Sequence, residues 1–166
     1  MIPPTFHGNK LPTVKVFGVD GNVLIDSATQ LFLCGIWNSF VIDWMLRQKV
    51  TTTINFFYLY QLPIPRLGEQ APAFRPIAAR AARLTCTTPE FDALAQQVGL
   101  RDHRDGATDP VERARLRAEL DGLVAHLYGL TEAEFAHILA TFPLVDEVAK
   151  AAALSASRDV EKGRVK

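Results

Sequence analysis

The stretch NSFVIDWMLRQKVTTTINFFYLYQLPIP, residues 38–65, decides the expected fold, because its hydrophobic periodicity changes part-way along. The first part continues an apolar pattern over residues 28–49, with hydrophobic side chains at helical spacing and little polar face. Such a helix is expected to pack on most of its sides. Residues 54–62 are instead rich in the aromatic and branched side chains typical of a strand. Pro63 and Pro65 lack a backbone N–H, so strand pairing is expected to stop there.

Two polar residues, Asn38 and Ser39, interrupt the apolar helix. We interpret them as groups at a helix kink or in buried hydrogen bonds, because a buried polar side chain needs a partner. Upstream, residues 14–19 alternate like a strand, residues 20–22 (Asp-Gly-Asn) are a turn signal, and residues 23–25 are apolar again. This pattern predicts a β-hairpin before the helix.

In the second half of the chain, capping residues predict where the helices begin. Thr88 and Asp109 each precede a proline, and Thr131 has a glutamate three residues later, so each is predicted to begin a helix. A last helix is expected from about Asp146 to Lys162. In the helix after Asp109 an apolar stripe is separated from a set of charged residues predicted to face solvent: Arg113, Arg115, Arg117, Glu119 and Asp121.

The expected fold is therefore α+β and predominantly helical, with a small short-stranded sheet and a long buried helix followed by a helical bundle. Residues 1–66 hold ten of the fifteen aromatic side chains and form the predicted α/β segment. Residues 67–166 form the predicted helical region. The boundary is expected within residues 67–76, where glycine and proline recur.

Composition limits the classes of function. Eighteen basic and eighteen acidic residues cancel, so any contact with nucleic acid must come from a local cluster. Cys34 and Cys86 show neither a redox pair nor a disulfide framework, which favours a reducing compartment. The N-terminal residues lack the pattern of a signal peptide, and polar residues inside the apolar helix disfavour membrane insertion. We expect a cytoplasmic protein without a membrane partner.

The motifs in residues 38–65 resemble the target-recognition region of adenine-specific DNA methyltransferases of the type IIG restriction-modification class. Asn-Ser leads the apolar helix, and Asn-Phe-Phe-Tyr-Leu closes on Gln-Leu-Pro-Ile-Pro. Residues 113–145, RARLRAELDGLVAHLYGLTEAEFAHILATFPLV, resemble the helical C-terminal end of the same polypeptides. Two linked motifs in the same order make the resemblance specific. It implies that residues 1–66 belong to a target-recognition segment.

The chain departs from that family in its catalytic motifs. An adenine-N6 methyltransferase holds S-adenosylmethionine in a glycine-rich loop and grips the flipped adenine with an Asn/Asp-Pro-Pro-Tyr/Phe loop. Residues 2–5 (Ile-Pro-Pro-Thr) lack the flanking residues of the second loop, and residues 18–21 lack the spacing of the first. No nuclease core is evident. We therefore expect no catalytic residue and no cofactor in this chain, with S-adenosylmethionine bound elsewhere in a longer parent enzyme.

The expected DNA-binding residues surround the end of the apolar helix and the turn after it. Cationic, hydroxyl and amide groups of this kind hold phosphates, and glutamine or asparagine can read an adenine edge. The predicted set is Lys15, Arg47, Gln48, Lys49, Thr51, Thr52, Thr53 and Asn55. Arg47 and Lys49 have an alternative role, since cations also complement the negative end of a helix. Five neighbouring side chains fit either a core strand or a surface that offers stacking and polar edges to a base or a groove: Asn55, Phe56, Tyr58, Tyr60 and Gln61.

Two further patterns do not support a catalytic or metal site. Residues 103–105 (His-Arg-Asp) match a kinase triplet without the other kinase motifs, so we interpret them as a loop. Glu134 and His137 share a helix face, but the second helix of a di-iron site is missing. We expect no metal.

The predicted function is a DNA target-recognition and scaffold fragment of an adenine-N6 DNA methyltransferase or fused restriction enzyme. Its expected partners are double-stranded DNA and the methyltransferase domain of the parent polypeptide. The alternative is a structural interaction module of the same enzyme that does not contact DNA. Under either hypothesis a fragment is expected to expose an apolar patch, which permits self-association.

Overall fold

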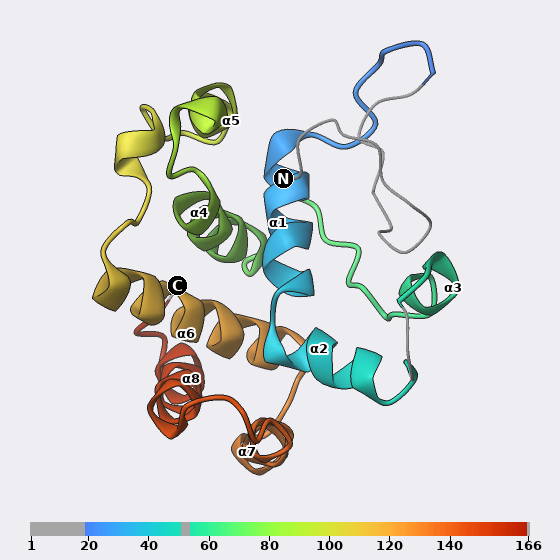
Figure 1. Ribbon diagram of the computed structural model, residues 1–166, viewed down its shortest axis with the longest axis vertical. Coiled ribbons are helices and arrows are strands. Elements are labelled where there is room, and N and C mark those ends of the chain that lie inside the picture. The colour runs from blue at the N-terminus through green and yellow to red at the C-terminus, as the bar shows by residue number, and fades with distance from the viewer. Residues whose placement is uncertain (1–18, 51–53, 166) are drawn as a thin grey trace.

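The computed structural model describes residues 19–50 and 54–165, which form helices joined by loops (Figure 1). In chain order the α-helices are α1 (Ser27–Trp37), α2 (Phe40–Arg47), α3 (Phe56–Leu59), α4 (Phe74–Thr85), α5 (Asp92–Gln97), α6 (Pro110–Leu127), α7 (Glu132–Ala140) and α8 (Glu147–Glu161). Two short 3-10 helices are η1 (Pro89–Phe91) and η2 (His103–Asp105). None of the helices in these ranges is both long and apolar enough to span a membrane.

The predicted sheet is absent from the described residues, so the α+β assignment was wrong for this part of the chain. Residues 23–25, the predicted return arm of the hairpin, form no strand: Val23 makes only an isolated β-bridge, and Leu24 and Ile25 lie in a bend. Val23 and Leu24 are 61% and 63% exposed. Consecutive strand residues point to opposite faces, so two exposed neighbours leave this segment without the buried face that stabilises a strand. Most of the other predicted arm, residues 14–18, lies outside the described residues.

The predicted strand at residues 54–62 is also wrong, because this segment contains the one-turn helix α3. Asn55 is its N-cap, and the Asn55 side-chain oxygen accepts a hydrogen bond from the Tyr58 N–H at 3.4 Å. This local cap satisfies a backbone donor that a strand would have paired with a neighbour. The chain then returns to the core, where Leu62 is buried and the Pro63 carbonyl accepts from the Tyr128 hydroxyl at 3.1 Å.

The apolar helix predicted over residues 28–49 divides at Asn38 and Ser39 into α1 and α2, as their polar character indicated. Ser39 is 1% exposed, and its hydroxyl donates to the Ile36 carbonyl at 2.7 Å. The same oxygen is the N-cap acceptor for the Ile42 N–H. The break therefore satisfies its own polar groups and changes the direction of the chain (Figure 1).

The helix starts predicted in the second half are confirmed at three positions. Asp109 accepts from the Glu112 N–H and caps α6, Thr131 forms a complete capping box with Glu134 at α7, and Asp146 caps α8. Thr88 instead precedes the 3-10 helix η1 and makes no capping hydrogen bond with its side chain. The side chain of a capping residue acts within its own turn, which explains why these starts are visible in the sequence.

One hydrophobic core joins both halves of the described chain. The rings of Phe32 on α1 and Phe74 on α4 stack with centroids 4.8 Å apart. Leu120 and Val124 bring α6 into the same core cluster. Figure 1 shows α4 beside α1, with α6 crossing the ends of both and α7 and α8 beyond α6. The resulting arrangement places the α1–α2 break against the middle of α6.

Helices α6 and α8 approach each other backbone to backbone at Gly122. A Cβ atom added there would lie 2.7 Å from the Ser157 nitrogen and 2.8 Å from the Ala156 carbonyl carbon. Glycine is needed here because no other side chain fits between the two backbones. This contact fixes how close α8 lies to the residues just before Gly122, including Asp121.

Candidate functional site

The described members of the predicted DNA-binding set lie where α2 ends and α3 begins, a region we call the α2–α3 corner (residues 47–49 and 54–61). Arg47, Gln48, Lys49 and Asn55 are all exposed. Lys49 Nζ lies 3.4 Å from Gln61 Oε1, which brings the end of α2 next to the end of α3. The other predicted residues, Lys15, Thr51, Thr52 and Thr53, fall outside the described residues.

Arg47 is held by two contacts at this corner. Its Nε and Nη2 donate to the two carboxylate oxygens of Asp43, each at 3.0 Å. Its guanidinium carbon lies 4.7 Å from the centroid of the Phe142 ring. The hydrogen bonds to Asp43 raise the pKa of Arg47. The guanidinium is therefore oriented but more than half exposed, with its Nη1 free of any partner among the described residues.

The remaining polar groups of the corner make weaker contacts. Gln48 Nε2 is 3.4 Å from the Trp44 carbonyl, and Asn55 Oδ1 accepts from Tyr58. Lys49 has only the neutral Gln61 as partner, so its charge is not balanced by a carboxylate in the described part of the chain. A groove of about 320 Å³ lies alongside, between α2 and residues 61–63. The corner thus offers exposed donors beside a shallow depression.

Three aromatic residues at α3 are exposed instead of forming a core strand: Phe56, Phe57 and the C-cap Tyr60. Phe57 and Tyr60 are 67% and 81% exposed. The Phe56 and Tyr60 rings stack with centroids 5.6 Å apart and an interplanar angle of 23°. Exposed aromatic surface of this kind is usually covered by a partner or a ligand. It also suits stacking against nucleic-acid bases.

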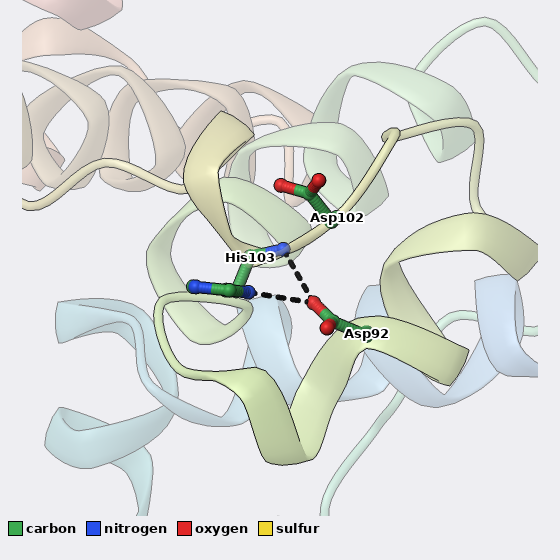
Figure 2. A group of neighbouring side chains, drawn as sticks. All are labelled: Asp92, Asp102 and His103. Atoms are coloured by element: carbon green, nitrogen blue, oxygen red, sulfur yellow. Dashed lines mark hydrogen bonds and ion pairs between the residues drawn. The ribbon is translucent and has the colours of Figure 1, made fainter.

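A cluster of two carboxylates and one imidazole lies elsewhere, between α5 and η2 (Figure 2). The possible ligand atoms of Asp92, Asp102 and His103 lie within 4.8 Å of one another. Asp92 Oδ1 accepts both the backbone N–H and the ring Nδ1 of His103, at 2.8 and 2.7 Å. These hydrogen bonds lower the pKa of Asp92.

Both oxygens of Asp102 in that cluster accept from the Arg104 guanidinium, which lowers the pKa of Asp102. A cation would have to displace Arg104 from Asp102 and the hydrogen bonds of His103 from Asp92. These contacts hold η2 against α5, which explains why the three side chains lie close together. The His-Arg-Asp triplet at residues 103–105 forms η2 and takes part in this contact between η2 and α5.

A second cavity, of about 870 Å³, lies between α1, α2, α4, α6 and the start of α8. Asp121 of α6 lines it and is only 8% exposed. Its Oδ1 accepts a hydrogen bond of 2.9 Å from the Phe40 N–H at the start of α2. Burial raises the pKa of Asp121 to about 7, against a smaller opposing effect of that hydrogen bond.

The sequence interpretation missed Asp121, which it placed on the solvated face of its helix. Hydrophobic periodicity alone does not show that the α1–α2 pair covers the face of α6 that carries Asp121. The available signal is the local run Leu120-Asp121-Gly122-Leu123-Val124, in which one carboxylate stands among residues suited to a core. A titratable group with a perturbed pKa in a cavity is a candidate for function.

Comparisons with protein-family models, with curated proteins and with solved structures found no match to this chain. The functional argument therefore depends on the sequence motifs and on the geometry of the α2–α3 corner and the Asp121 cavity.

Proposed function

We propose that this chain is the DNA target-recognition and scaffold part of an adenine-N6 DNA methyltransferase or fused restriction enzyme, and that it contacts duplex DNA through the α2–α3 corner. The support from sequence is the resemblance over residues 38–65 and 113–145. The support from geometry is that Arg47, the last residue of α2, and the next two residues, Gln48 and Lys49, are all exposed. The proposed role belongs in the cytoplasm, together with its double-stranded DNA.

The corner has the chemistry of a phosphate contact. Lys49 is a cation without a carboxylate partner among the described residues, and Arg47 keeps Nη1 available while Asp43 orients the rest of its guanidinium. Phosphate oxygens are bound by such donors, which position a protein on the duplex. Gln48 and Asn55 carry amide groups that can donate to and accept from a base edge. The net charge of the whole chain is zero, so the contact must be local.

S-adenosylmethionine and the transferred methyl group belong, under this proposal, to the methyltransferase domain of the parent polypeptide. The 166 residues contain neither the expected glycine-rich loop nor an Asn/Asp-Pro-Pro-Tyr/Phe loop. The chain's own part is to bind and orient the duplex. Methyl transfer catalysed by the isolated chain would contradict this division of roles.

A second candidate function is an interaction module of the same enzyme that does not touch DNA. The observation that favours it is the exposed aromatic surface of α3, where Phe57 and Tyr60 have most of their area free. In this alternative the cations of α2 only complement the negative end of their helix. The α3 surface would then pack against another domain of the parent.

Removing the two cations separates the candidates. In the full natural polypeptide, the double substitution Arg47→Ala and Lys49→Ala should weaken binding to duplex DNA. The slope of log affinity against log salt concentration should become shallower by about 2, one unit for each lost phosphate contact. The measurement is fluorescence anisotropy of a labelled duplex at several salt concentrations.

The matched control is Arg101→Ala with Arg104→Ala. These two arginines are 86% and 79% exposed and pair with nearby aspartates, as Arg47 does. They lie around η2, on the other side of the molecule from α2 and α3 (Figure 1). The control should leave the salt slope unchanged. Equal effects of both double variants, or none of either, would favour the module that does not contact DNA.

A further inference from the structure

The cavity beside Asp121 has a polar lining that the proposed DNA contact does not use. Its walls come from five helices, and its polar side chains include Cys34 of α1, Asn38 at the end of α1, Thr85 of α4, and Arg117 and Asp121 of α6. At about 870 Å³ it has the size of a small-molecule site. Much of the remaining wall is apolar.

Asp121 is a buried acid that uses only one of its two carboxyl oxygens in a hydrogen bond. Its Oδ1 accepts from the Phe40 N–H at 2.9 Å, while its Oδ2 has no hydrogen-bond partner in the described part of the chain. The residue is more than nine-tenths buried. A buried carboxylate without a cation is strongly unfavourable, because it has lost its hydration without gaining an ion pair.

The neighbouring charged groups do not supply that cation. Arg113 donates its Nη1 to the backbone carbonyls of Leu84 and Ala107, at 3.1 and 2.7 Å. Arg117 is exposed at the cavity and makes no ion pair with Asp121. Helix α6 therefore presents the Asp121 carboxyl to the cavity without neutralising it.

Apart from the donors of Arg113 and Arg117, the other polar side chains of the lining mainly offer acceptors. Asn38 donates its Nδ2 to the Cys34 carbonyl at 2.8 Å, which leaves its Oδ1 available. Asp146 accepts from the Val148 N–H as the cap of α8. A complementary ligand must bring hydrogen-bond donors, a positive charge for Asp121 and an apolar body for the walls.

We propose that this cavity binds an ammonium or guanidinium group carried on an apolar body, with Asp121 as its counter-ion and Asn38 Oδ1 as a second acceptor. The group belongs either to a small organic cation or to a lysine or arginine side chain of the full natural polypeptide. Both sources present the same chemistry. The site is independent of whether the α2–α3 corner contacts DNA, and only its second source rests on the proposal that the chain belongs to a longer polypeptide.

Binding is expected to depend on pH through Asp121, whose pKa burial raises to about 7. The ionised form binds the cation, so affinity should rise as pH increases from 6 to 8, by about tenfold if only that form binds. The titratable groups that face the cavity are Cys34 of α1, Asp43 of α2, Arg113 and Arg117 of α6, and Asp146 before α8. The α4 residues that line it, Ala81, Leu84 and Thr85, do not titrate in this range.

The test uses phenylguanidine, a guanidinium on an apolar ring, and phenylurea, its neutral counterpart. Calorimetric titration of the 166-residue chain at pH 8 should show saturable binding of phenylguanidine and at least tenfold weaker binding of phenylurea. Asp121→Asn keeps the acceptor for the Phe40 N–H and should weaken phenylguanidine binding at least tenfold. Asp109→Asn is the control, because asparagine also caps a helix and Asp109, the exposed N-cap of α6, does not line the cavity; affinity should stay within about threefold.

Equal binding of phenylguanidine and phenylurea, or no saturable binding of either, would overturn the proposal. So would undiminished binding by a folded Asp121→Asn variant; if that variant does not fold, the comparison of the two probes in the unsubstituted chain decides. The same titration in the full natural polypeptide distinguishes the sources. Binding there indicates a site for a free organic cation, whereas binding only to the 166-residue chain indicates that a side chain of the longer polypeptide occupies the cavity.

Discussion

Asp121 Oδ1 accepts a hydrogen bond of 2.9 Å from the backbone N–H of Phe40, 81 residues earlier in the chain. Phe40 is the first residue of α2, and the backbone N–H groups in the first turn of a helix have no acceptor within that helix. The bond therefore satisfies a helix terminus with a side chain from the middle of α6. It also fixes the α1–α2 break against the rest of the core and orients the helix that carries Arg47.

Asp121 should make the stability of the folded chain depend on pH between about 4 and 7. Its pKa is about 7 in the fold and about 3.8 ordinarily, so the folded state holds a proton that the unfolded state releases. The free energy of unfolding therefore falls as pH rises through this window, by as much as about 4 kcal/mol. Urea unfolding at pH 5 and pH 8 measures the larger part of this fall, about 2–3 kcal/mol.

The variant Asp121→Asn isolates this effect from those of other carboxylates. It should flatten the fall between pH 5 and pH 8 and raise the free energy of unfolding at pH 8 by about 1–3 kcal/mol. A variant whose pH dependence matches that of the unsubstituted chain would show that Asp121 titrates normally.

Gly122→Ala should destabilise the α6–α8 contact. The new methyl group would lie 2.7 Å from the Ser157 nitrogen, and a backbone atom cannot move aside as a flexible side chain can. We expect a loss of about 1–3 kcal/mol in the free energy of unfolding. Gly68→Ala is the control, since its added Cβ meets nothing within 4 Å, and it should be close to neutral. Equal effects would mean that α6 and α8 are not in close contact.

Thr131→Ala should remove the capping box of α7 and cost about 0.5–2 kcal/mol. The Thr131 backbone N–H and hydroxyl donate to the Glu134 carboxylate and lower its pKa, so these two hydrogen bonds stabilise the fold at neutral pH and weaken as pH falls through the folded pKa of Glu134. Thr88→Ala is the matched control, because Thr88 precedes η1 without a capping hydrogen bond. Thermal unfolding at pH 7 should distinguish the two variants. Similar losses would contradict the assigned cap.

The exposed rings of α3 should promote self-association of the 166-residue chain. Phe57→Ser with Tyr60→Ser removes the two most exposed rings and should lower the apparent mass in sedimentation velocity at high concentration. The control Val111→Ser with Val148→Ser removes two other exposed apolar side chains, 78% and 75% exposed. It should change the apparent mass less. A monomer at all concentrations would remove the support for self-association through this surface.

The features predicted correctly from the sequence are local ones, each determined by a few neighbouring residues. The caps at Asp109, Thr131 and Asp146 act on their own first turns, and the break at Asn38 and Ser39 follows from polar groups in an apolar helix. These features need no knowledge of distant contacts.

The errors came from composition without tertiary context. Aromatic content suggested a strand at residues 54–62, yet the cap at Asn55 begins a short helix whose rings are exposed. Strand preference describes fit to a half-buried surface, and these residues do not form one. Asp121 was assigned to solvent because its burial depends on the α1–α2 break, far away in the sequence.

Photo-crosslinking most directly tests whether the α2–α3 corner touches DNA. A benzoylphenylalanine at Gln48, in the full natural polypeptide bound to duplex DNA, should crosslink to the duplex. The same group at Gln96, an exposed glutamine of α5 on the other side of the fold, should not (Figure 1). Crosslinking from Gln48 alone is the expected result, whereas no crosslink from Gln48, or equal crosslinking from both positions, would contradict DNA recognition by this corner.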